Sequence, residues 1–122
     1  MLFRSKKGVP SYQAFLKTQT HLLEVGEAYS QVLAVKWYYD KVNSLLDDEY
    51  KSLLLQLGAL HSLKTIRQNA EWYLEQGYLS STKSKAIRQR IERLCSELRP
   101  HVNTLVDGFG IPKTLVSAPI AN

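Results

Sequence analysis

The sequence predicts an all-α protein: an antiparallel bundle of three long helices, the third kinked at Pro100, followed by a short C-terminal segment. Two observations lead to this prediction. Apolar residues recur at the three- and four-residue spacing of amphipathic helices over most of the chain, whereas strand-like alternation is lacking. In addition, Gly77, Pro100 and Pro112 stand where the helical pattern stops, bends or restarts.

The first long helix is expected from about residue 11 to about residue 39, after a tail over residues 1–10. Ser11 is a candidate N-cap because its hydroxyl can accept a hydrogen bond from a free backbone amide. One face carries a nearly continuous apolar stripe, and three valines on the other side indicate a second neighbour. The stripe includes Tyr12, Phe15, Leu16, Leu22, Leu23, Tyr29, Leu33 and Trp37.

The second helix is expected from about Asp48 to about Gln76. Asp47, Asp48 and Glu49 precede or open it, where carboxylates stabilise the positive end of the helix dipole. Its first half is apolar on one side and its second half on nearly the opposite side, which is typical of a helix packed against more than one partner. Gly77 is the expected stop.

The third helix is expected to begin after a cap at Ser80 or Ser81. Its apolar stripe is narrow, and Leu105 and Phe109 return to it beyond Pro100, which favours one kinked helix over two unrelated ones. Gly108 and Gly110 should end it, Pro112 suits the first turn of a final segment, and Pro119 closes that segment. The stripe consists of Ile87, Ile91, Leu94 and Leu98.

Residue types that carry catalysis or bind metals are scattered along the chain. The three histidines (His21, His61 and His101) have no second ligand at metal-site spacing, so no metal site and no catalytic residue are assigned. The Ser80–Lys83 spacing resembles a nucleophile motif without its companion motifs, and a helix cap explains it better. Glycine-rich nucleotide loops are missing. The single cysteine, Cys95, is expected to pack as a small apolar residue.

The formal charge of +5 is concentrated in the tail and in residues 80–122, where seven Lys and Arg oppose three acids. The basic side chains of the third helix surround its apolar stripe instead of gathering on one face, which argues against nucleic-acid binding. Apolar runs such as residues 53–55 are far too short to span a bilayer.

Two stretches resemble the C-terminal helical domain of peroxisomal acyl-CoA oxidases. Residues 57–80, with LGALHSLKTI and WYLEQGYLS, resemble the penultimate helix and turn of that family. Residues 83–121 resemble its last helix and C-terminal segment, and LVDGFGIP at residues 105–112 is the most specific part. The residues that map are structural: Gly77 and Tyr78 at the turn, then Asp107, Phe109 and Pro112.

The resemblance implies an enzyme that oxidises acyl-CoA to trans-2-enoyl-CoA. FAD takes up the electrons and passes them to O2, which gives H2O2 in peroxisomal fatty-acid β-oxidation. It also implies a homodimer several times longer than this chain, with the catalytic carboxylate and most FAD and acyl-CoA contacts elsewhere. The last three residues, Ile-Ala-Asn, are not a Ser-Lys-Leu type peroxisomal signal, so a cytoplasmic location stays open.

On this view the 122-residue chain completes the fold and the dimer, holds no FAD by itself and is inactive alone. One alternative is a stand-alone helical interaction module derived from the same domain, without enzyme activity. The other is a nucleic-acid or anionic-surface binder, against which the spread of the basic side chains argues. The oxidase domain and the interaction module both need an apolar contact surface, because three helices of this length leave part of their apolar surface uncovered. The candidate interface residues are Trp37, Tyr38, Leu53, Leu54 and Leu57.

Overall fold

A computed structural model describes residues 11–46 and 48–115, so the predicted tail, Asp47 and Pro119 lie outside the described residues. Helices and turns make up this part of the chain, and it contains no strand. The all-α prediction is therefore confirmed. The chain divides into two compact units, residues 1–45 and residues 46–122.

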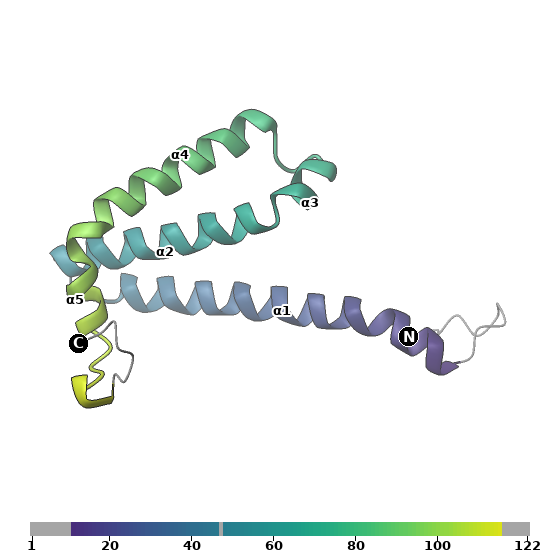
Figure 1. Cartoon of the computed structure of the whole chain (residues 1–122), viewed down its shortest axis with the longest axis horizontal. Coiled ribbons are helices and arrows are strands. Elements are labelled where there is room, and N and C mark those ends of the chain that lie inside the picture. The colour runs from purple at the N-terminus through teal and green to yellow at the C-terminus, as the bar shows by residue number, and fades with distance from the viewer. Residues whose placement is uncertain (1–10, 47, 116–122) are drawn as a thin grey trace. The chain divides into compact units, whose positions relative to one another are not determined.

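The described part of the first unit is dominated by one helix, α1, which spans Ser11–Asn43 (Figure 1). The helix was predicted correctly and extends four residues beyond the expected end near Tyr39. Ser11 belongs to the helix itself, so its assignment as the N-cap was wrong. At the other end the Ser44 hydroxyl donates to the Lys41 carbonyl at 2.6 Å and satisfies one of the last free carbonyls.

The first helix of the second unit, α2, spans Glu49–Gln68 and begins at the acidic residues where its start was predicted. The Asp48 carboxylate accepts a hydrogen bond of 2.8 Å from the Lys51 backbone amide, and Glu49 occupies the first turn. Both carboxylates therefore lie at the positive end of the helix dipole.

The predicted second helix is interrupted, which corrects its expected span to Gln76. It breaks at Asn69, and a short helix, α3, follows over Ala70–Glu75. The Asn69 backbone leaves the helical region (φ −110°, ψ 18°) while its side-chain amide donates to the Thr65 carbonyl at 3.0 Å. Asparagine competes with the helix for backbone partners in this way, and the apolar spacing alone gives no sign of it.

Gly77 ends α3 as predicted. Its φ of +73° is a left-handed conformation that a residue with a Cβ adopts only with strain. The chain then reverses, and the backbone amides of Tyr78 and Leu79 both donate to the Tyr73 carbonyl, at 2.9 and 3.2 Å. Ser80 caps the next helix, α4 (Ser81–Leu98), by accepting a hydrogen bond of 3.2 Å from the Lys83 amide.

Pro100 bends the third predicted helix without ending its helical course. After α4, a single 3₁₀ turn, η2 (Arg99–His101), leads into α5 (Val102–Asp107). Gly108 ends α5, Gly110 has a φ of +63°, and a last 3₁₀ turn, η3, covers Lys113–Leu115 directly after Pro112. The kink and both stop signals are thus confirmed.

In the second unit α2 and α4 pack against each other and run in opposite directions, joined through α3 and the Gly77 turn (Figure 1). Leu53 on α2 and Leu94 and Leu98 on α4 are buried, and Leu94 has no exposed surface. The two helices diverge toward the end where α3 lies (Figure 1). The buried apolar contacts therefore come from the opposite end of this helical hairpin.

Candidate interaction surfaces

The predicted interface residues differ widely in exposure. Trp37 on α1 is 66% exposed, whereas Tyr38 is half-buried and meets the Tyr39 ring edge to face, with centroids 5.9 Å apart. Burial, followed by the neighbouring Tyr39 hydroxyl, raises the pKa of Tyr38 above its usual value. On α2, Leu53 is buried, and Leu54 and Leu57 are half-buried.

The first helix exposes many more large apolar side chains than the two that were singled out. Most large apolar side chains of its stripe are exposed, and so are Val25 and Val32 on the other side, whereas Leu33 and Val35 are half-buried. The exposed set on α1 is Tyr12, Phe15, Leu16, Leu22, Leu23, Val25, Tyr29, Val32 and Trp37. Exposed apolar surface of this extent usually marks a partner site.

An aromatic cluster closes the turn at Gly77 and Tyr78. The Trp72 indole stacks on the Tyr78 ring, with centroids 5.8 Å apart and planes inclined by 29°. The same indole meets Tyr73 nearly edge to face at 5.2 Å. The predicted motif residue Tyr78 therefore acts within a three-ring cluster that the sequence reading did not identify. The sequence feature that could have revealed this cluster is the presence of Trp72 and Tyr73 about one helical turn before Gly77.

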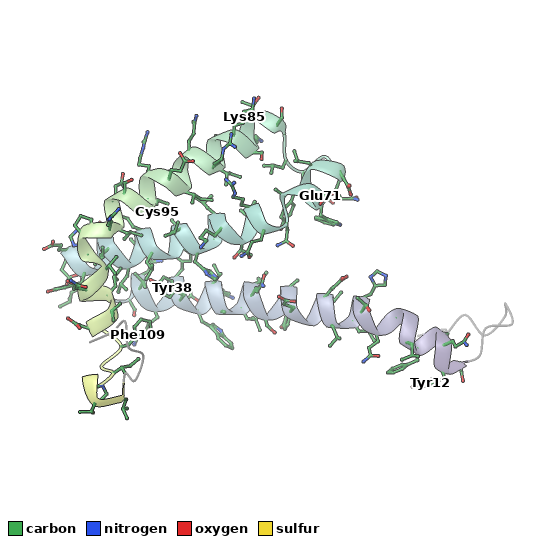
Figure 2. The ribbon with its side chains drawn as sticks, in the orientation of Figure 1. Tyr12, Tyr38, Glu71, Lys85, Cys95 and Phe109 are labelled. Carbon is green, nitrogen blue, oxygen red and sulfur yellow. The ribbon has the colours of Figure 1, made fainter. Side chains whose placement is uncertain are left out.

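The second motif, Asp107, Phe109 and Pro112, forms two successive backbone turns. The Gly110 amide donates to the Asp107 carbonyl at 2.9 Å, and the Leu115 amide donates to the Pro112 carbonyl at 2.9 Å. The Phe109 side chain, labelled in Figure 2, is 78% exposed. This segment therefore has an ordered backbone but presents its aromatic side chain to solvent.

The described residues contain no group of three His, Cys, Asp or Glu that could hold a metal ion. His21 contacts Glu24 at 3.5 Å, and both side chains are exposed, as befits a solvated helix surface. Ser80 caps α4, which confirms the reading of the Ser80–Lys83 spacing. Within the same described ranges, no helix is long and apolar enough to cross a membrane.

The exposure of Cys95 differs from the prediction made from the sequence. It was expected to pack as a buried apolar residue, but the thiol is free and exposed on α4 (Figure 2). The α4 stripe explains this. At 100° per residue Cys95 lies roughly 40° beyond the edge of the stripe formed by its buried and half-buried isoleucines and leucines.

A groove runs between α2–α3 and α4 where these helices diverge. One part encloses about 430 Å³ and has an apolar floor that includes Ile66, Leu74 and Ile87. The adjoining part encloses about 440 Å³. Arg67 and Arg88 line both parts, Lys85 lines the first, and Lys64 and Glu92 line the second. The sequence analysis placed Lys85 and Arg88 on a solvated helix surface and made no prediction for Lys64 and Arg67, so it missed that two helices bring these cations together.

The amino-acid sequence is similar to proteins of one known family. The sequence matches the acyl-CoA oxidase family over residues 2–122. The chain belongs to the acyl-CoA oxidase family. The resemblance seen in the two sequence motifs is thereby confirmed across the whole helical region.

Three acyl-CoA oxidase relatives show how the match is distributed. Acyl-coenzyme A oxidase 3 of Yarrowia lipolytica is 24% identical over 118 residues, which are 97% of this chain and 17% of the relative. The peroxisomal acyl-coenzyme A oxidase 3 of Arabidopsis thaliana is 30% identical over 108 residues, 88% of this chain and 16% of the relative. Peroxisomal acyl-coenzyme A oxidase 1 of Bos taurus is 29% identical over 92 residues, 75% of this chain and 14% of the relative.

The chain thus spans about one sixth of the length of these acyl-CoA oxidases. A shorter Arabidopsis thaliana relative is 30% identical over 108 residues, and the chain spans 57% of it. No solved structure matches the chain.

Proposed function

We propose that this chain is the C-terminal helical domain of an acyl-CoA oxidase and that it completes the fold and the dimer of that enzyme. The observation that carries the proposal is the coverage. Nearly the whole chain aligns with the family, yet it accounts for about one sixth of the relatives compared above. In an enzyme of that length, most of the residues that carry out the reaction then lie outside this domain.

The complete enzyme would remove two hydrogens from an acyl-CoA and form trans-2-enoyl-CoA. FAD would accept them and pass them to O2 as H2O2, in peroxisomal fatty-acid oxidation. Two of the relatives compared above are named peroxisomal, which supports that location for the complete enzyme.

The positions of two glycines support placing FAD outside the described residues. Gly77 and Gly110, which have positive φ, each follow the end of a helix instead of forming a phosphate loop at the start of one. We therefore assign no step of the oxidation to this domain, and we place FAD and the catalytic carboxylate in other domains.

The partners we propose are the remaining oxidase domains and a second subunit, not nucleic acid. The support is the number of exposed apolar side chains along α1, which a folded protein normally covers. Trp37 and Tyr38 remain candidates for that contact, together with the half-buried Leu54 and Leu57. Leu53 is a weaker candidate because the chain itself already buries it.

A stand-alone interaction module without enzyme activity is the second candidate. The shorter plant relative favours it, because the same helical region there makes up more than half of a protein. The reading frame upstream of Met1 in the genome separates the two candidates. An in-frame continuation with the remaining oxidase regions supports the first, and an upstream stop codon supports the second.

Activity is tested by a peroxide-coupled assay of the purified chain with added FAD and acyl-CoAs of several chain lengths. We expect no peroxide above the level without protein, whereas a full-length relative assayed in parallel should produce it. Flavin-dependent turnover by the chain alone would show that the domain carries the chemistry itself.

A further inference from the structure

The groove between α2–α3 and α4 combines an apolar floor with an unusually one-sided rim of charge. Arg67 and Arg88 line its whole length, Lys64 and Lys85 add two cations, and Glu92 is the one carboxylate among its lining residues. Apart from Gln68, the remaining lining residues are apolar or small: Ile66, Ala70, Leu74, Leu79, Ile87 and Ile91, with Ser81 and Ser84 at one end.

Within the described part of the chain, none of the four cations forms an ion pair with a carboxylate, although Glu92 lines the second part of the groove. Among the described residues the ion pairs are His21–Glu24 and Arg90–Glu97, and neither includes a groove residue. Arg67 and Arg88 are both exposed, and so are Lys64 and Lys85. Four unpaired cations along one groove repel one another, and an anionic partner relieves that repulsion while it gains charge-assisted hydrogen bonds.

The spacing of the cations matches the geometry of helices. Lys64 and Arg67 are three residues apart on α2, and Lys85 and Arg88 are three residues apart on α4, so each pair lies on one face of its helix. From Ser81 to Glu92 the groove follows α4 for about 16 Å, or roughly three helical turns. An open groove of that length between two antiparallel helices has the shape into which a third helix packs.

We propose that this groove docks an acidic amphipathic helix from outside the described residues. Its apolar stripe would lie on the isoleucines and leucines of the floor, and its glutamates or aspartates would face Arg67 and Arg88 on the two sides. This is the helix-in-groove mode of recognition, in which apolar anchors supply affinity and flanking charges select the partner. The proposal concerns the groove alone and stands whether or not the proposed oxidase role is correct.

Two synthetic peptides test the proposal with the full 122-residue chain. Both are fluorescein-labelled and about 14 residues long, with the same leucine stripe; one carries glutamates beside the stripe and the other lysines. Fluorescence anisotropy should show the glutamate peptide binding at least about tenfold more tightly, and added salt should weaken that binding. Equal affinity of the two peptides would overturn the proposal.

Variants separate the groove from general charge effects. Arg67→Gln and Arg88→Gln, on different helices, should each weaken binding of the glutamate peptide about tenfold. The matched control is Arg93→Gln, an exposed arginine of α4 that does not line either part of the groove. Circular dichroism checks that all three variants are folded. A loss as large for Arg93→Gln as for Arg88→Gln would contradict the proposal.

The apolar floor and a competing ligand class complete the test. Leu74→Ser should weaken binding of the glutamate peptide, whereas Leu46→Ser, at an exposed site away from the groove, should not.

Inorganic pyrophosphate is the small-anion probe. If it binds in an Arg88-dependent way while the glutamate peptide does not bind, the groove is a small-anion site and the helix-docking proposal is wrong.

Discussion

The Trp72 indole stacks on the Tyr78 ring across the turn that separates α3 from α4. Its ring centroid lies 5.8 Å from that of Tyr78, and the Gly77 backbone between them has a φ of +73°. The stack and the left-handed glycine depend on each other, because the chain must reverse at Gly77 for Tyr78 to reach Trp72. Gly77 and Tyr78, which were predicted from the sequence to be structural residues, therefore act together in this turn.

Gly77→Ala should destabilise the second unit by about 1–2 kcal/mol, because a Cβ is unfavourable in the left-handed conformation. Gly26→Ala is the matched control. Gly26 lies inside α1, and a Cβ there meets nothing within 4 Å, so alanine should stabilise that helix by up to about 1 kcal/mol. Urea denaturation followed by circular dichroism measures both. A neutral Gly77→Ala would show that the turn relaxes without strain.

Leu94→Ala should be among the most destabilising single substitutions in the second unit. Leu94 is the only described side chain with 0% exposure, and removing a buried leucine costs about 2–5 kcal/mol. Leu46→Ala removes the same atoms from a side chain that is 87% exposed and should change the free energy of unfolding by less than about 0.5 kcal/mol. Similar losses for the two variants would mean that the α2–α4 contact is not the core.

The Cys95 thiol should react with a thiol reagent such as DTNB in the native protein. The exposed position predicts one thiol per chain titrated before denaturant is added. Cys95→Ser should abolish the signal without a change in the circular dichroism spectrum. Labelling that appears only after unfolding would instead support the buried cysteine expected from sequence.

The isolated chain should self-associate at micromolar concentration through exposed apolar side chains. Trp37→Asp places a charge at a side chain that is 66% exposed and should shift sedimentation velocity toward the monomer while helicity is retained. Leu54→Asp, at a half-buried site, should either dissociate the oligomer or unfold the domain. A wild-type chain that sediments as a folded monomer and binds no apolar dye would contradict this prediction.

Signals confined to one helix were predictable from sequence. Ser80 caps a helix and Gly77 stops one through a short side chain or backbone freedom, so their roles were found, and Asp48 lies at the helix start where its carboxylate was expected. Asn69 was missed because Ile66, Ala70 and Tyr73 continue the apolar spacing across the break. That spacing records which side is buried and not whether the backbone stays helical.

Features that need two helices were not predictable. The sequence reading distributed the basic residues of the third helix around its apolar stripe, and only the packing of α2 on α4 brings Arg67 and Arg88 to one groove. The burial of Leu53 has the same origin, since its apolar neighbours at positions 54 and 57 share its helix yet remain half-buried. How deeply a side chain of one helix is buried depends on the helix that packs against it.

The short reversal at Gly77 also has a consequence for how fast this unit assembles. Because α2 and α4 diverge near this turn (Figure 1), the contacts between them close longer loops, and the buried Leu53 and Leu94 are 41 residues apart. Most contacts of the chain nevertheless join residues that are close in sequence, within single helices. Helical proteins rich in such local contacts fold within microseconds to milliseconds. Stopped-flow refolding should therefore show the helical signal of residues 46–115 recovered largely within the dead time, and a variant with a longer linker at Gly77 should refold more slowly.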